Sequence, residues 1–568
     1  MIKPKKMKKT ILTMLTVAFA TSFAISQTVD DGIKFIYFQR YKSATETLQK
    51  VIASKPKDAY SIYWLGQAYL ADDKIDSAKA VYQKALNDGM NDPWIWIGTG
   101  HVQILENNDV NSAKQKFEQA ITATKGKKGV ENADILNAIG RAMADGSSQQ
   151  GDPAYGVEKL KRAAQINTTN PDIDINLGIC YLKQGSDKGG VAVEAFTDAT
   201  RRNAQYAEAY FRIGKIYESQ SNTEYMNEWF GKAIAADPAY APVYLEYFNY
   251  YKERDVNVAK EYIDKYVANA DKDCKTDYFV ADYLYRAGKN QESIAKAKEM
   301  ENGACKDYVR VNILYAYNYN KMGDSVSAYN AIQKFFASES GKVDTSASDY
   351  AIAGIVAGKV GQTDSAVAYL QKAYEIDTVQ QHRSTYIDTI SNIFKRAKKY
   401  QERLQWVQKA YALNPNPTNR DVYDYGEAAY FAGNYELADS VFKVYEQKFP
   451  DQIYGPMWRF KVAQAKDTSM QSGIIVQPAN EYLTFLKQDT AKYKSSLIQV
   501  HGTLAGYYAN VAKNKDSAIY HLEQILVYDP GNPDAQKYID LLKKPAAKPS
   551  TEKSPGAKPK TKPKSGAK

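Results

Sequence analysis

Histidine and cysteine are the side chains best suited to metal binding and to proton or nucleophile chemistry, and this sequence has four of the first and three of the second. His501 and His521 are predicted to lie on paired helices, which would allow an acid–base or metal role. The sequence offers no third ligand beside them, so ordinary helix-surface histidines are the alternative that we favour. No GxxxxGK, GxSxG, HExxH or CxxC motif occurs. We therefore predict no enzymatic activity, no cofactor and no metal.

Two of the cysteines stand in near-copies of one segment, Cys274-Lys-Thr-Asp-Tyr and Cys305-Lys-Asp-Tyr. Both are expected at the starts of consecutive helix pairs, where an oxidising compartment would permit a disulfide worth about 3 to 4 kcal/mol. The alternative is that such starts lie about 10 Å apart, beyond the limit of about 7 Å for bridging. We favour the disulfide. Cys180 is interpreted as a buried small apolar residue.

The elements that must position these residues follow one recurring pattern between residues 27 and 542. A glycine is followed by a small or aromatic residue, then after a polar gap by a small residue and two apolar ones. Steps of three and four put these side chains on one helix face, and the gap predicts a turn. The clearest copies are Gly66, Tyr69, Ala78, Tyr82 and Ala85; Gly214, Tyr217, Met226, Phe230 and Ala233; and Gly426, Ala429, Ala438, Phe442 and Tyr445.

Each copy is therefore an antiparallel helix pair, which cannot bury its apolar face without neighbours. The pattern resembles the tetratricopeptide repeat, a helix–turn–helix unit of 34 residues. The resemblance covers nearly all of residues 27–542 and implies an all-α fold, a right-handed superhelical solenoid of about 14 repeats. Because the signature residues are packing residues, it indicates the fold more strongly than the function.

In this family the first helix of each repeat lines the concave face, so offsets from the signature small residue select candidate partner-binding residues. Aromatic side chains there would give a bound peptide a large contact area at low entropy cost. The alternative is that, among 46 tyrosines, many pack between helices. The candidates are Tyr60, Tyr63, Phe211, Lys215, Tyr317, Arg420, Tyr423, Glu427, Tyr430 and Tyr507.

A second recurring motif is Asp, then Ser or Thr, then an apolar residue. It is similar to an O-glycosylation acceptor of exported bacterial proteins, but an aspartate at a helix start also caps free amides and suits the helix dipole. We favour capping, although an exposed helix start permits both. The copies begin at Asp76, Asp324, Asp364, Asp439, Asp489 and Asp516.

The formal charge of +10 is concentrated at the two ends, and residues 27–542 carry a net −3. Residues 1–26 combine five lysines, an apolar stretch and small residues, the pattern of an export signal peptide. The apolar stretch falls short of the about 20 residues that span a membrane comfortably; an uncleaved anchor is the alternative. We expect a protein of the periplasm or one associated with the outer membrane.

Residues 543–568 hold nine lysines, five prolines and no aromatic or branched apolar residue, which predicts a disordered tail. Its lysines would suit anionic cell-wall polymer or lipid, or serve only as a soluble spacer. The slightly acidic body argues against nucleic acid as a partner.

The sequence thus predicts a non-catalytic scaffold that holds other envelope proteins or extended peptides along a concave face. The alternative is an envelope tether, in which the tail binds anionic polymer or lipid and the solenoid is a spacer.

Overall fold

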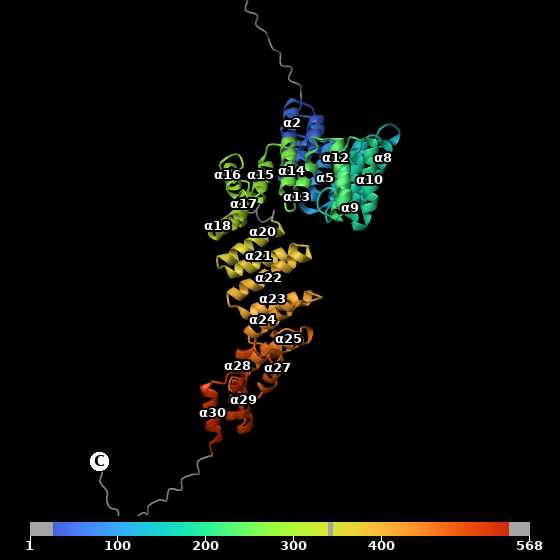
Figure 1. Ribbon diagram of the computed structural model, residues 1–568. Helices are drawn as coiled ribbons and strands as arrows, with labels where there is room; N and C mark the ends of the chain where they lie inside the picture. Colours follow the sequence, from blue (N-terminus) through green and yellow to red (C-terminus); the bar gives the residue numbers. More distant parts are fainter. Residues whose placement is uncertain (1–26, 339–344, 545–568) are drawn as a thin grey trace, which may run out of the picture. The chain divides into compact units, whose positions relative to one another are not determined.

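The computed structural model describes residues 27–338 and 345–544, and the chain divides into two compact units, Met1–Met322 (unit 1) and Gly323–Lys568 (unit 2). The predicted signal peptide, residues 1–26, lies outside the described residues, and so does the predicted tail from residue 545 onward. The described part of the chain is built of helices and contains no strand (Figure 1). The predicted all-α repeat solenoid is confirmed.

Unit 1 consists of successive helix pairs, from α1 with α2 to α15 with α16, each of which packs on the pair that follows; α17 packs on α15 and α16. Its helices are α1 (Val29–Tyr37), α2 (Tyr41–Ser54), α3 (Ala59–Ala71), α4 (Ile75–Asn87), α5 (Pro93–Asn107), α6 (Val110–Ala123), α7 (Ala133–Ala144), α8 (Pro153–Ile166), α9 (Asp172–Gln184), α10 (Gly189–Arg202), α11 (Ala207–Ser219), α12 (Thr223–Ala236), α13 (Ala241–Tyr251), α14 (Val256–Asn269), α15 (Cys274–Arg286), α16 (Asn290–Asn302) and α17 (Arg310–Lys321), with the 3-10 helices η1 (Lys127–Gly129) and η2 (Ser186–Lys188).

Unit 2 continues the same arrangement, beginning with a helix that packs on α20. Its helices are α18 (Ser325–Ala337), α20 (Ala347–Lys359), α21 (Thr363–Ile376), α22 (Gln380–Arg396), α23 (Tyr400–Leu413), α24 (Asn419–Phe431), α25 (Tyr435–Lys448), α26 (Tyr454–Lys466), α27 (Val476–Leu486), α28 (Lys494–Asn510), α29 (Lys515–Tyr528) and α30 (Pro533–Lys543).

Many helices start at a cap that the sequence encodes. Asp92 and Asp152 accept hydrogen bonds from backbone amides of the first turn, and each is followed by a proline at the first helical position. Thr418 and Asp421 form a reciprocal capping box at the start of α24. These side chains satisfy amides that have no partner within the helix, and proline needs no such partner there.

The glycine of the pattern is the point where the two helices of a pair come closest. At Gly66, a β-carbon would lie 2.0 Å from Cζ of Tyr82, and at Gly426 it would lie 2.6 Å from Cζ of Phe442. Both aromatic rings are fully buried. The hydroxyl of Tyr82 donates to the carbonyl oxygen of Tyr63 at 2.8 Å, which fixes its position. Glycine is required at these places because the partner helix carries a large ring into the space of a side chain.

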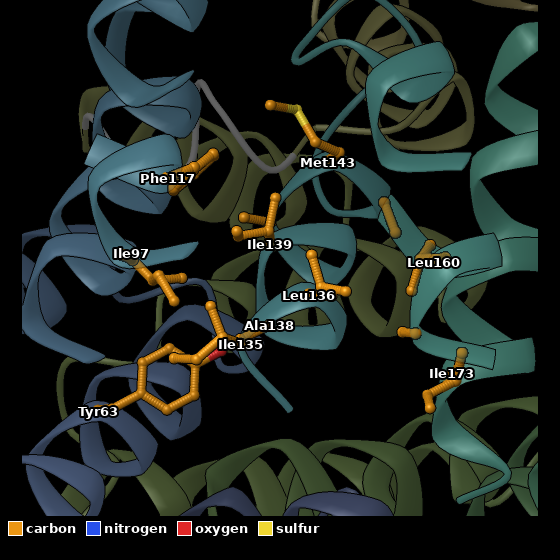
Figure 2. Close-up of a cluster of buried hydrophobic side chains, with 14 of the residues drawn as sticks. Tyr63, Ile97, Phe117, Ile135, Leu136, Ala138, Ile139, Met143, Leu160 and Ile173 are labelled. Carbon is orange, nitrogen blue, oxygen red and sulfur yellow. The ribbon is translucent and has the colours of Figure 1, made fainter. Parts of the chain in front are cut away.

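Behind these contacts lie several clusters of buried apolar residues. The largest cluster given for unit 1 extends from α2 to α10. Figure 2 shows ten labelled members, with Ile135 and Ile139 of α7 between Ile97 and Phe117 on one side and Leu160 and Ile173 on the other. The core therefore passes from repeat to repeat, as expected for stacked pairs.

The first helix pair of unit 1 also packs against the repeats that begin about 170 residues later. The ring of Tyr37 lies 4.9 Å from that of Tyr206 and 5.1 Å from that of Tyr240. Its hydroxyl accepts a hydrogen bond of 2.9 Å from the backbone amide of Ala207, the first residue of α11. In Figure 1, α2 lies beside α14 within unit 1. The superhelix of unit 1 is thus closed by its own first repeat.

Asp271, two residues after the end of α14, completes this closing contact. Only 5% of the residue is exposed, and its carboxylate accepts hydrogen bonds from Arg40 Nε at 3.1 Å, from Ser43 N at 2.9 Å and from Ser43 Oγ at 2.5 Å. A buried carboxylate needs such partners, because an unpaired charge in the interior is costly. We call the contacts of Tyr37, Arg40 and Ser43 with α11–α14 the closing contact.

The close approach at glycine can be tested with a matched pair of substitutions in unit 2. Gly426→Ala is expected to lower the free energy of unfolding by about 1 to 3 kcal/mol, because the new methyl group collides with Phe442. Gly506→Ala, in α28, meets nothing within 4 Å and is expected to be neutral or to stabilise by up to about 1 kcal/mol through helix propensity. Urea unfolding followed by circular dichroism measures both. Equal effects of the two substitutions would contradict the packing described.

Candidate interaction surface

Of the predicted groove residues in unit 1, Tyr63 lies in the packed interior, and Tyr60 and Phe211 are partly buried against apolar clusters. Tyr63 is fully buried, within the core that Figure 2 shows, and its hydroxyl accepts a hydrogen bond from Arg141 Nη1 at 3.2 Å. Tyr60 is partly buried with its ring 4.8 Å from Trp94. Phe211 stacks on Phe230 at 5.5 Å. The prediction that Tyr63 faces a partner is wrong, because the residue is part of the core.

A polar network ties together the first helices that surround Tyr63. Arg141 lies over the ring of Trp64 at 4.5 Å and forms an ion pair with Asp172. Asp172 also accepts a hydrogen bond of 2.8 Å from Asn137 Nδ2. Burial alone would lower the pKa of Arg141, but Asp172 and Tyr63 raise it overall, so the guanidinium remains charged. The side chains of this network bond to one another and hold α3, α7 and α9 together.

Lys215 on α11 is half-exposed, and its charge is already neutralised. Its Nζ lies 2.5 Å from Glu218 and 2.8 Å from Glu246 on α13. Burial would lower its pKa, but these two carboxylates raise it. Lys215 therefore links two neighbouring first helices.

Tyr317 on α17 is partly buried, and its ring lies 5.6 Å from that of Tyr285 on α15. Beside Tyr285 is a cavity of about 330 Å³ at the carboxyl ends of α13, α15 and α17. Four cationic residues that the sequence analysis did not select line it: Lys252, Arg254, Arg286 and Lys321. The signal that could have found them is the recurrence of Lys252, Arg286 and Lys321 at intervals of 34 and 35 residues.

Four predicted residues occupy one face of α24 in unit 2. Arg420, Tyr423, Glu427 and Tyr430 are spaced by three, four and three residues, which aligns them along the helix. Arg420 is exposed and lies 3.7 Å from Asp424. The other three lie between α22 and α26, because Glu427 pairs with Lys395 of α22 and the two tyrosines contact Trp458 of α26.

The aromatic part of this face joins α24 to α26. The ring of Tyr423 lies 5.2 Å from that of Tyr454, and the ring of Tyr430 lies 5.1 Å from that of Trp458. Next to them Phe431 is 44% exposed and Tyr454 is 40% exposed. Large aromatic side chains with this much open surface can contact a partner, while their buried neighbours hold them in place.

The charged part of the face is fixed by ion pairs. Glu427 accepts hydrogen bonds from Lys395 Nζ at 2.8 Å and from Arg403 Nη2 at 2.9 Å. Burial would raise the pKa of Glu427, but these two hydrogen bonds outweigh it and lower the pKa. Burial and the charge of Glu427 raise the pKa of Asp424. We call the exposed and half-exposed residues Arg420, Tyr423, Asp424, Glu427, Tyr430, Phe431 and Tyr454 the α24 face.

Tyr507 on α28 lies apart from the α24 face. It is partly buried, its ring is 5.2 Å from that of Tyr508, and its hydroxyl approaches Gly473 in the turn between α26 and α27. The ring packs against that turn.

The two matched cysteine segments meet in the structure. Cys274 and Cys305 form a disulfide with their Cα atoms 5.4 Å apart, which is inside the range that bridging allows. The bond joins the start of α15 to the turn after α16 and closes a loop across 31 sequence positions. Cys180 is buried, as the sequence predicts.

The Asp-Ser/Thr motif occurs at helix starts in four copies. Asp324 is an N-cap whose carboxylate accepts from the amide of Ser327 at 3.0 Å. Asp76, Asp364 and Asp516 lie in the first turn of α4, α21 and α29, where a negative charge suits the helix dipole. Asp439 differs, because it lies inside α25 and pairs with Arg459. Side-chain capping therefore accounts for Asp324 and dipole stabilisation for the other three.

His501 and His521 form a buried pair, so the prediction of helix-surface histidines is wrong. Their Nδ1 atoms are 2.9 Å apart, and 1% and 7% of the two residues are exposed. Since one nitrogen must donate and the other accept, at least one of the two rings must be neutral. Tyr508 stacks on His521, and Tyr528 on His501. Among the described residues, no group of three or more His, Cys, Asp or Glu is placed to hold a metal ion.

The comparison with known families decides the identity of the repeat. Residues 32–93 and residues 207–240 match models of the tetratricopeptide repeat. The chain contains tetratricopeptide repeats. The first match spans α2 to α4, and the second spans α11 and α12, the helices that carry Gly66 and Gly214. No curated protein matches the chain.

Several solved structures contain similar repeats. The C-terminal part of a TPR repeat-containing protein from Cytophaga hutchinsonii is 23% identical, with 46% of this chain and 98% of that chain covered and a TM-score of 0.33. The APC/C hetero-tetramer Cut9-Hcn1 is 14% identical. The match covers 90% of this chain and 95% of that chain, with a TM-score of 0.31. YrrB, described as a TPR protein with an unusual peptide-binding site, is 25% identical. The match covers 34% of this chain and 94% of that chain, with a TM-score of 0.21. No helix in the described ranges has the length and apolar character that crossing a membrane requires.

The histidine pair predicts a loss of stability in acid. Burial, and then the neighbouring His521, lower the pKa of His501 to about 4. Burial, and then Lys487, lower the pKa of His521. As the pH drops, the histidines of the unfolded chain therefore bind protons before those of the folded chain. The free energy of unfolding falls between about pH 6.5 and pH 4, by about 1.4 kcal/mol per unit of pKa shift. Amide hydrogen exchange of α28 and α29, corrected for the intrinsic rate, should show this loss between pH 7 and pH 5.

A double variant, His501→Leu with His521→Leu, provides the control for that measurement. It removes both titrating rings, so the difference between pH 7 and pH 5 in α28 and α29 should largely disappear. An unchanged pH dependence in the variant would assign the effect to other groups.

Proposed function

We propose that this protein is a non-catalytic scaffold of the bacterial envelope, which holds another protein or an extended peptide on the α24 face of unit 2. Tetratricopeptide repeats are compatible with a protein-interaction scaffold. Export to the periplasm or association with the outer membrane rests on the composition of residues 1–26. The disulfide between Cys274 and Cys305 agrees with an oxidising compartment.

The observation that carries the proposal is the open aromatic surface of the α24 face. Phe431 and Tyr454 expose about two fifths of their surface on adjacent first helices. In contrast, Tyr63, which stands three residues before Gly66 as Tyr423 stands three before Gly426, is fully buried in unit 1, and its hydroxyl accepts from Arg141. A partner that covers an aromatic cluster gains apolar burial, and the ion pairs of Glu427 keep the surrounding charges in fixed positions.

A tether is the second candidate function. Residues 543–568 carry nine lysines against one glutamate, a composition that anionic cell-wall polymer or lipid would attract. In that case the envelope would retain the protein through this segment, and the α24 face would be dispensable.

Affinity capture from envelope extract tests the scaffold proposal with a surface variant and a matched control. Arg420→Glu with Phe431→Ala alters only exposed side chains of the α24 face. Lys443→Glu with Tyr520→Ala makes the same kinds of change on exposed positions of second helices. We expect the wild type and the control to retain one defined protein, and the α24 variant to lose at least nine tenths of it, as quantified by mass spectrometry.

Removal of residues 543–568 separates the two functions. Under the scaffold proposal the truncated protein keeps its protein partner. If truncation releases the protein from the envelope while the α24 variant binds as the wild type does, the tether is correct and the scaffold proposal fails.

A further inference from the structure

The cavity at the carboxyl ends of α13, α15 and α17 has the strongest local excess of positive charge among the cavities described in this structure. Lys252, Arg254, Arg286 and Lys321 line its volume of about 330 Å³, together with Glu253, Val256 and Tyr285. The body of the chain, in contrast, is slightly acidic. This cavity belongs wholly to unit 1 and is separate from the α24 face.

The repeat places three of these cations in register. Lys252 directly follows α13, Arg286 is the last residue of α15 and Lys321 is the last residue of α17. Their intervals of 34 and 35 residues match one repeat. Each therefore stands at the carboxyl end of a first helix, where the helix dipole favours a positive charge. The result is a row of cations, one for each repeat.

The cations of the row already pair with carboxylates of the protein itself, which shows the kind of group that they bind. Arg286 pairs with Glu253 and donates from Nε to Asp282 at 3.2 Å. Lys252 Nζ lies 3.9 Å from Asp282 and donates to Asn249 Oδ1 at 3.0 Å. Burial lowers the pKa of Lys252, and Asp282 opposes this while Arg286 and Arg310 add to it. Within the described residues, Lys252 thus has one long ion pair, with Asp282 at 3.9 Å.

Tyrosine rings hold the cations in place. Lys321 Nζ lies 5.0 Å from the centroid of Tyr285, whose ring also lies 5.3 Å from the guanidinium carbon of Arg286. Arg254 lies over Tyr250 at 4.0 Å. Such contacts fix long side chains that would otherwise lose rotamer entropy on binding.

We propose that this row binds an acidic segment of a partner protein, with carboxylates of an extended chain meeting Lys252 and Lys321. A single small anion would need donors that converge on one point, as in a phosphate nest. Here the donors are distributed over three successive repeats, which suits several carboxylates along one chain. Electrostatic attraction of this kind raises the association rate and is weakened by salt.

Fluorescence anisotropy with a labelled ten-residue peptide of alternating Asp and Glu tests the proposal on the full chain. Lys252→Gln with Lys321→Gln is expected to weaken binding at least tenfold. Lys265→Gln with Lys298→Gln removes the same charge from exposed positions of α14 and α16, and should leave the affinity within twofold of the wild type. The titrations are repeated without residues 543–568, because nine lysines there also attract acidic peptides.

Three results would overturn the proposal. The first is equal binding by the Lys252/Lys321 variant and the Lys265/Lys298 control, and the second is no binding by the wild type. The third is displacement of the peptide by inorganic phosphate at a concentration equal to that of the peptide, which would assign the cavity to a small anion. The Arg420→Glu, Phe431→Ala variant should bind the peptide normally, so failure at the α24 face and failure at this row are distinguishable.

Discussion

The structure depends on the close approach of two helices at one small residue in each repeat. At Gly66 and Gly426 the second helix of the pair inserts a ring into the space that a side chain would occupy. This contact holds the pair together, but it leaves the outer apolar faces of both helices to be covered by the next pair. Stacking, and with it the alignment of first helices along one face, follows from that requirement.

Stacking alone would leave the superhelix of unit 1 open, and the closing contact joins its first repeat to later ones. Arg40 and Asp271, which are 231 positions apart, form an ion pair, and Tyr37 fits between Tyr206 and Tyr240. First-helix residues that the family offers to a partner, among them Tyr63, are part of the core in unit 1. The surfaces that we propose for partners are the α24 face of unit 2 and the row of cations in unit 1.

The sequence predicts the parts of the structure that repeat. Helix pairs follow from the spacing of glycine, small and aromatic residues, and the two similar cysteine segments point to the bond between Cys274 and Cys305. No such signal predicts the closing contact. Asp271 and Arg40 are not part of the recurring pattern, and they meet only because the six intervening repeats curve. The burial of the histidine pair could not be predicted from the sequence for a related reason. The spacing places His501 and His521 on paired helices, but their burial depends on how Tyr508 and Tyr528 pack around them.

Amide hydrogen exchange at Ala207 tests the closure of unit 1 most directly. Ala207 is the first residue of α11, where an amide has no partner within the helix, and its hydrogen bond goes to the hydroxyl of Tyr37. We expect this amide to be protected in the wild type and to exchange at least tenfold faster in a Tyr37→Phe variant, while α20 and α21 exchange as before. Fragmentation-resolved mass spectrometry gives the rate at this residue. An Ala207 amide that exchanges in the wild type as fast as a free peptide would contradict the closure and reopen the inner face of unit 1 to partners.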